Sequence, residues 1–174
     1  MSRLVAMTTL AAAVMLAGAA PSRPLGSEDA ACAADEPGPA LRVDVEGLKD
    51  RKGVVRVELY PDNDTDFLAD DTALIAQGKA FRRIDEPVPA DGKVELCIRA
   101  PAVGSYAVAV LHDRNGDLKF NAFVDGAGFP NNPKLGLAKP KARQTSLVIG
   151  PGVTAITVIM NYWNGLSFGP HHVR

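Results

Sequence analysis

The chain has 174 residues, of which 47% are hydrophobic and 22% charged, and its formal net charge is −1. This composition is that of a globular domain and excludes a disordered or fibrous protein. The nearly neutral charge argues against binding to nucleic acid or to an anionic membrane surface.

The first segment of the chain predicts an export signal. Arg3 supplies a positive start, residues 4–20 form an uncharged run rich in Ala and Leu, and Ala17-Gly18-Ala19 is a small-x-small cleavage pattern. The run is shorter than the roughly 20 apolar residues of a membrane span. We therefore expect a signal peptide over residues 1–19, no transmembrane segment in the mature form, and a periplasmic or secreted location; a retained N-terminal anchor is the alternative.

Export changes the interpretation of the two cysteines. An even number of cysteines in an oxidising compartment usually forms disulfides, and Cys32 and Cys97 are the only pair in the chain. We expect this disulfide, with two unpaired thiols as the alternative. Residues 20–40 are rich in Pro, Gly, Ala and acidic residues without periodicity, which predicts an extended linker.

Alternation of apolar and polar residues with a period of two predicts about seven strands. They cover residues 41–46, 54–59, 79–84, 94–99, 105–112, 144–149 and 154–162. A polar turn ending at Gly53 joins the first two strands, which we expect to form a hairpin. A short helical turn capped by Asp71 is expected over residues 71–77.

The strand pattern predicts an all-β fold over residues 41–165, followed by a tail over 166–174. Many short strands separated by turn signals favour an immunoglobulin-like or transthyretin-like β-sandwich, with a closed barrel as the main competitor. The strand 105–112 has apolar residues on both faces, which is typical of a central strand. In the strand 94–99, Cys97 lies on the face opposite the apolar residues.

The segment 113–142 is irregular and unusually long for so compact a domain; such loops are usually functional or disordered. It opens with oxygen side chains at Asp113, Asn115, Asp117 and Asn121, a spacing by which one loop wraps a hard cation. We predict that Asp113, Asn115 and Asp117 bind one calcium-like ion, and we expect no other cofactor.

This loop departs from an EF-hand in two respects. Its glycine, Gly116, is the fourth loop residue instead of the sixth, and Val124 stands where a bidentate Glu is required. The alternative is a tight turn rich in Asx residues and glycine at the end of a central strand.

A second acidic run follows the strand 54–59, and it contains Asp62, Asn63, Asp64 and Asp66. It is either a solvated loop or a metal half-site that the 113–142 loop would complete. The neighbours His112 and Asp113 suggest an enzyme as a rival interpretation, but adjacent strand residues point to opposite faces. We therefore assign no catalytic residue.

The end of the last strand is rich in aromatic and amide side chains. Tyr162 and Trp163 are residue types found in carbohydrate-binding faces, although such residues more often cap a core. A carbohydrate-binding module is therefore a further alternative.

Several segments resemble one bacterial family, known as domain of unknown function 2141. GSYAVAVLHDRNGD (residues 104–117) resembles its "G-x-Y-A-hydrophobic, then H-D-x-N-G-N/D" core, and DGAGFPNN (125–132) resembles its "E-G-x-G-F-S-N-N" segment. GVVRVELY (53–60) is similar to its early strand and Asn161-Tyr162 to its closing strand. The chain departs from the family in a shortened link before Asp125 and in Pro130, where Ser is usual. The resemblance implies an exported β-sandwich and supplies no activity.

These observations predict a non-enzymatic binding or structural module of the cell envelope. Its partner would be an envelope protein or a glycan. A sandwich scaffold hosts many unrelated functions, so the assignment depends on the site and not on the fold.

Overall fold

The computed structural model describes residues 25–33, 35–136 and 138–171. These residues form ten strands and two short helices, α1 (Asp71–Ala76) and α2 (Ala142–Thr145). The strands are β1 (Ala40–Glu46), β2 (Val54–Pro61), β3 (Arg82–Pro87), β4 (Val94–Arg99), β5 (Gly104–Asp113), β6 (Gly126–Gly128), β7 (Ser146–Ile149), β8 (Val153–Ile159), β9 (Asn161–Trp163) and β10 (Phe168–Pro170). The predicted signal peptide lies outside the described residues.

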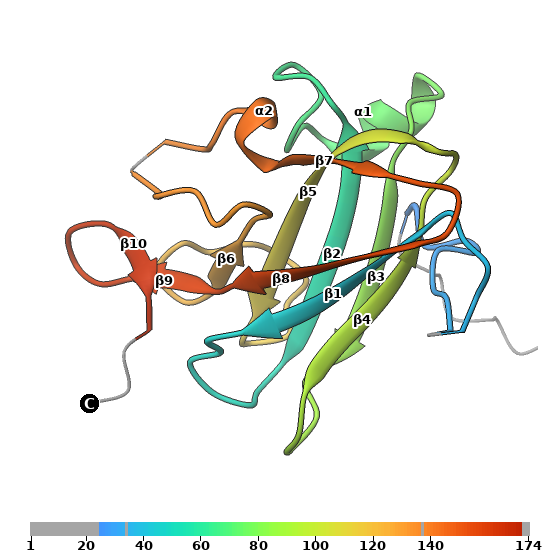
Figure 1. Ribbon diagram of the computed structural model, residues 1–174. Coiled ribbons are helices and arrows are strands. Elements are labelled where there is room, and N and C mark those ends of the chain that lie inside the picture. Colours follow the sequence, from blue (N-terminus) through green and yellow to red (C-terminus); the bar gives the residue numbers. More distant parts are fainter. Residues whose placement is uncertain (1–24, 34, 137, 172–174) are drawn as a thin grey trace, which may run out of the picture.

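The strands form two separate sheets and not a closed barrel, which confirms the predicted all-β sandwich (Figure 1). Sheet A has the order β4-β1-β8, with β1 antiparallel to β4 and parallel to β8. Sheet B has the order β10-β9-β6-β5-β2-β3, and β7 pairs with the other end of β5. The apolar strand β5 is central, as its sequence predicts.

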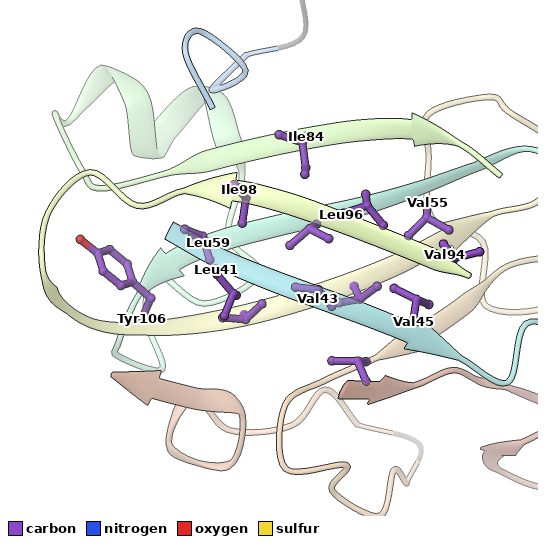
Figure 2. Packing of buried hydrophobic residues seen from close by; sticks show 14 of the residues in the cluster. Leu41, Val43, Val45, Val55, Leu59, Ile84, Val94, Leu96, Ile98 and Tyr106 are labelled. Atoms are coloured by element: carbon purple, nitrogen blue, oxygen red, sulfur yellow. The ribbon is translucent and has the colours of Figure 1, made fainter. Parts of the chain in front are cut away.

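The main core fills the space between the two sheets. Figure 2 shows the β1 residues Leu41, Val43 and Val45 among apolar side chains of β2, β4 and β5. Of these, Leu41 and Val43 are fully buried. Full burial of one such side chain contributes about 1.5–3 kcal/mol, so this alternating set holds the sheets together.

A second hydrophobic cluster lies on the outer face of sheet B. It joins Tyr60 of β2 and the alanines of β5 to side chains from α1, α2, the 113–142 loop and the segment between β2 and α1, among them Phe67, Leu74, Phe129 and Leu135. Sheet B is therefore covered on both faces.

The predicted hairpin of the first two strands is wrong. β1 pairs with β4 and β8 in sheet A, whereas β2 pairs with β3 and β5 in sheet B. The turn before Gly53 thus carries the chain from one sheet to the other. Alternation determines only which residues face the core. A hairpin and a crossover between the sheets both place the apolar residues in the core, so alternation does not distinguish them.

Four other elements differ in detail from the sequence prediction. Asp70, and not Asp71, caps α1, because its carboxylate accepts a hydrogen bond from the Ala73 N–H at 2.8 Å. Residues 144 and 145, predicted to start a strand, belong to α2, and the strand predicted over 154–162 divides at Met160 into β8 of sheet A and β9 of sheet B. A further strand, β10, follows residue 165.

The disulfide between Cys32 and Cys97 is confirmed. It fastens the segment before β1 to the edge strand β4, where Cys97 is partly exposed. Ala30 of this segment is fully buried, and the Arg99 N–H donates to its carbonyl at 2.7 Å. Part of the predicted linker is thus packed against the sandwich. No helix in the described ranges is both long and apolar enough to span a membrane.

Candidate functional site

The predicted cation-binding residues organise the turn that follows β5. The two carboxylate oxygens of Asp113 accept hydrogen bonds from the Gly116 and Leu118 N–H groups at 2.8 and 2.7 Å. Asp117 accepts hydrogen bonds from the Asn115 side chain and the Lys119 N–H. These bonds form an Asx-rich turn, as the alternative interpretation requires.

No three His, Cys, Asp or Glu side chains in residues 25–33, 35–136 and 138–171 are grouped so that they could hold a metal ion. Calcium binding by Asp113, Asn115 and Asp117 stays a prediction. It would depend on the amide oxygen of Asn115 and on backbone carbonyls besides the two carboxylates.

Asp125 and Arg114 fasten the two ends of this loop together. Asp125 is fully buried, and its carboxylate accepts hydrogen bonds from the Arg114 N–H at 3.0 Å and the Asn121 N–H at 2.7 Å. The Arg114 guanidinium pairs with Asp50 and donates to the Val124 carbonyl. Residues 113–125 are therefore a firmly held wall beside sheet B.

His112 is enclosed on the inner side of this wall. It is fully buried, with Nε2 2.8 Å from the Lys52 carbonyl and Nδ1 2.7 Å from the Tyr162 hydroxyl. The carbonyl can only accept, so Nε2 carries the proton and Nδ1 accepts from the hydroxyl. Burial lowers the pKa of His112 and keeps the ring neutral.

The acidic run lies far from the turn that follows β5, which contains the predicted cation-binding residues. Val54 is opposite Asp113 in the pairing of β2 with β5, whereas Pro61, which precedes the acidic run, is opposite Tyr106. A strand of this length separates the two ends by about 20 Å or more. The structure therefore does not bring the two halves of the suggested metal or enzyme site together.

Instead, the acidic run holds the second half of the long loop. Asp64 accepts a hydrogen bond from the Ala142 N–H at 2.8 Å and pairs with Lys141 at 3.4 Å. Lys139 donates to the Phe67 carbonyl at 2.9 Å. These contacts tie residues 139–142 over the outer face of sheet B.

Of the two candidate aromatic residues, only Trp163 is partly exposed. Tyr162 is buried, its hydroxyl accepts from the Lys49 N–H at 3.0 Å, and its ring packs so closely on Gly126 that a Cβ there would lie 2.4 Å from it. Trp163 makes an edge contact with Phe123, which is 77% exposed.

A network of buried and half-buried charges lies on the outer face of sheet B. Arg83 of β3 donates to Glu58 of β2 through Nε at 2.7 Å and to Asp71 of α1 at 2.7 Å. The Tyr60 hydroxyl donates to the other oxygen of Glu58 at 2.6 Å, and Arg56 pairs with Asp85 at 2.6 Å. Arg56 and Glu58 are only 7% and 2% exposed.

Tyr60 and Arg83 each hold one protonation state. Burial, followed by the negative charge of Glu58, raises the pKa of Tyr60 far above its usual value. Burial opposes the charge on Arg83, but the attraction of Glu58 and Asp71 outweighs this effect and raises its pKa. The tyrosine stays neutral and the arginine stays charged at all physiological pH values.

Beside the charged network, the outer face of sheet B is hollow. A pocket of about 440 Å³ opens between the sheet and the long loop. Its floor includes Arg56, Glu58, Arg83 and Ala127, and its walls include apolar residues of the loop and of β10. The lining residues are Arg56, Glu58, Tyr60, Leu68, Arg83, Leu111, Phe120, Ala122, Ala127, Phe129, Leu135, Gly136, Ala138, Lys139, Pro140 and Phe168.

Small side chains explain the hollow. Glu58 is opposite Ala109 in the sheet, and Leu111 is opposite Ala127. Ala127 on the floor, with Ala122, Gly136 and Ala138 around it, leaves space that larger residues would fill. Another hollow of about 400 Å³ lies beside β1 and β4, but none of the charged side chains that line it is buried.

Sequence reasoning missed the pocket, because Arg56 and Glu58 follow the same alternation as the polar residues of β1. It did point to the 113–142 segment, which supplies one wall. The residues of this segment that are predicted to bind a cation hold the pocket wall in place. Asp113 shapes the turn, and the Leu118 carbonyl in this turn accepts a hydrogen bond from Arg56 Nη1 at 3.3 Å.

No curated protein and no solved structure matches the chain. A family model described as "Uncharacterized protein conserved in bacteria (DUF2141)" matches residues 43–157, which include all of the described strands from β2 to β7 and most of β1 and β8. The chain therefore belongs to this bacterial family, as the resemblance of its His-Asp-x-Asn-Gly segment suggests.

Proposed function

We propose that this protein is a non-enzymatic binding module of the cell envelope, which holds a small ligand in the pocket on the outer face of sheet B. The observation that carries the proposal is a concave, mainly apolar site with a few buried charged groups at its floor. Ligand sites in proteins typically combine these features within about 300–1,000 Å³.

The chemistry of the floor favours binding over catalysis. Both oxygens of Glu58 accept hydrogen bonds, and Arg83 and Tyr60 supply them. A general acid or base must change its protonation state near neutral pH, and Tyr60 and Arg83 do not. Such groups recognise and orient a ligand.

The disulfide supports an exported location. Disulfides persist in the periplasm and outside the cell and are rare in the reducing cytosol. The confirmed pairing of Cys32 with Cys97 therefore agrees with the predicted signal peptide and with a periplasmic or secreted protein.

Glycan binding at Trp163 is a second candidate, favoured by the exposed aromatic pair that it forms with Phe123. Aromatic faces stack on sugar rings, and Trp163 lies at the edge of the sandwich. Retardation on immobilised polysaccharides that Trp163→Ala abolishes would support it, and unchanged migration would remove it.

The pocket proposal is tested with the fluorescent amphipathic probe 8-anilinonaphthalene-1-sulfonate. Ala127→Leu adds volume at the floor, whereas the control Ala155→Leu makes the same change at an exposed position on β8 of sheet A. We expect saturable fluorescence with the wild type and the control, and loss with Ala127→Leu in folded protein. Equal fluorescence from all three proteins would contradict the proposal.

A further inference from the structure

The pocket has a charged end and an apolar end. Arg56 and Glu58, at the floor, are almost fully buried, while Phe120, at the rim, is 48% exposed. The two nearly buried charges therefore lie at the closed end of the site. A ligand that fits this distribution has one polar head and an otherwise apolar body.

The charged residues that line the pocket determine whether a negative or a positive polar head of a ligand would be favoured. Arg56, Arg83 and Lys139 line the pocket with only one carboxylate, Glu58. Asp71 and Asp85, which pair with the two arginines, lie outside the lining. The residues that line the pocket thus include three cations and one carboxylate, and Arg56 Nη1 lies 4.0 Å from that carboxylate.

Arg56 offers a specific contact for an anion. Its Nε donates to Asp85 and its Nη1 to the Leu118 carbonyl, but no described residue accepts a hydrogen bond from its Nη2. Arginine cannot lose its proton in a protein, and it favours carboxylates among its partners. An unused donor on a nearly buried arginine marks where a carboxylate would bind.

The remaining lining fits an alkyl chain. Leu111, Phe129 and Leu135 are apolar and mostly buried, and Phe120 and Phe168 stand together at the rim with ring centroids 6.4 Å apart. At about 30 Å³ for each water-sized group, the volume holds at most roughly 15 non-hydrogen atoms. An acid with about ten carbons is within this limit.

The surface outside the rim is apolar as well. Phe123 is 77% and Leu166 is 87% exposed, and Phe123 contacts Trp163, which contacts Phe168 at the rim. Exposed apolar residues that adjoin a pocket usually belong to its interaction surface. A chain longer than the pocket would continue over these residues.

We propose that the pocket binds a medium- or long-chain aliphatic carboxylate, with its head at Arg56 and its chain directed past Phe120 and Phe168. This inference rests on the proposed function, because it names the ligand class of the same site. It requires no covalent step and no metal.

The test measures affinity by displacement of 8-anilinonaphthalene-1-sulfonate with hexanoate, octanoate and decanoate, all below the concentrations at which they form micelles. Each buried methylene contributes enough to raise affinity about four-fold. Decan-1-ol and decylammonium, with the same chain, should bind at least about ten-fold more weakly than decanoate, since neither can form an ion pair with Arg56.

The double variant Arg56→Gln with Asp85→Asn removes the cation without leaving its acid unpaired. It should bind decanoate and decan-1-ol with similar affinity. The matched control, Arg42→Gln with Glu95→Gln, removes an exposed ion pair of sheet A and should keep the wild-type preference. A thermal melt confirms that each variant is folded.

Equal affinity for the acid, alcohol and amine would overturn the ligand class, as would a preference that survives in the double variant. If Ala127→Leu still abolished binding in those cases, the pocket would remain the binding site and only the ligand class would fail. If no decyl compound bound in a way that depends on Ala127, the proposed function would fail as well.

Discussion

The outer faces of the two sheets differ although their sequences alternate in the same way. On β1, Arg42 and Asp44 are partly exposed, and Arg42 pairs loosely with Glu95 at 3.8 Å. On β2, the corresponding polar residues Arg56 and Glu58 are buried beneath a loop.

The difference arises from what covers each face. Among the described residues, the disulfide-bonded segment before β1 lies along the β4 edge of sheet A, whereas α1, α2 and the 113–142 loop pack over sheet B. Alternation in a strand thus indicates which residues face away from the core, but it does not indicate whether they face water. The covering segments decide that, and they lie elsewhere in the chain.

The largest predicted effect concerns the cover of sheet A. Replacing both Cys32 and Cys97 by Ser removes a cross-link between residues 65 positions apart. By loop-closure entropy this should lower the free energy of unfolding by about 4 kcal/mol and leave the sandwich folded. Urea denaturation measures the change. A loss below about 1 kcal/mol would show that the segment is held by its other contacts.

A matched pair of variants compares the buried and exposed charges directly. Glu58→Gln leaves Arg83 underpaired at a nearly buried position and should cost about 3 kcal/mol. Glu95→Gln breaks the exposed pair with Arg42 and should cost less than about 1 kcal/mol. Denaturation of both variants under the same conditions gives the difference. Similar losses would mean that the two faces are not electrostatically distinct.

Asp113→Ala tests the turn that holds the pocket wall. It removes an acceptor of two backbone N–H groups and should lower stability by about 2 kcal/mol. The same variant tests the calcium prediction. If the loop binds calcium in the ~0.1–1 mM range, excess calcium should raise the melting temperature of the wild type over that in chelator, but not that of Asp113→Ala. An unchanged wild-type value would leave the loop as a plain Asx turn.

The smallest predicted effect is a dependence on pH. Burial lowers the pKa of His112 below the 6.5 of an unfolded chain, so the unfolded state binds the proton first as pH falls. The stabilisation is fully present above pH 6.5 and declines below it, by at most about 1.4 kcal/mol per pH unit. His112→Gln should flatten the stability profile between pH 7 and 5 relative to the wild type. An equally steep profile in the variant would assign the effect to other groups.

The sequence predicts the core strands well because period-two alternation is local. Leu41, Val43 and Val45 face the core as their spacing indicates, and the apolar faces of β5 identify it as central. The disulfide is equally accessible to prediction, since only one pairing exists. The pairing partner of each strand cannot be predicted in this way, because β1 and β2 would show the same alternation whether they lay in one sheet or in two.

The pocket depends on contacts between distant segments. Glu58 meets Arg83 across a strand pair and Asp71 lies on α1, and nothing near any of them in the sequence signals this meeting. The long loop could be singled out from its length. The surface that this loop covers could not be predicted, because the pocket results from small residues such as Ala127, which no sequence motif marks.

The most direct test of the central claim is a methyl spectrum of the ¹³C-labelled protein titrated with decanoate. Binding in the pocket predicts saturable shifts of the Ala127, Leu111 and Leu135 methyl groups, with Ala155 and Val153 of sheet A unchanged. Shifts confined to sheet A, or no saturable shift at the three pocket methyl groups, would contradict the account.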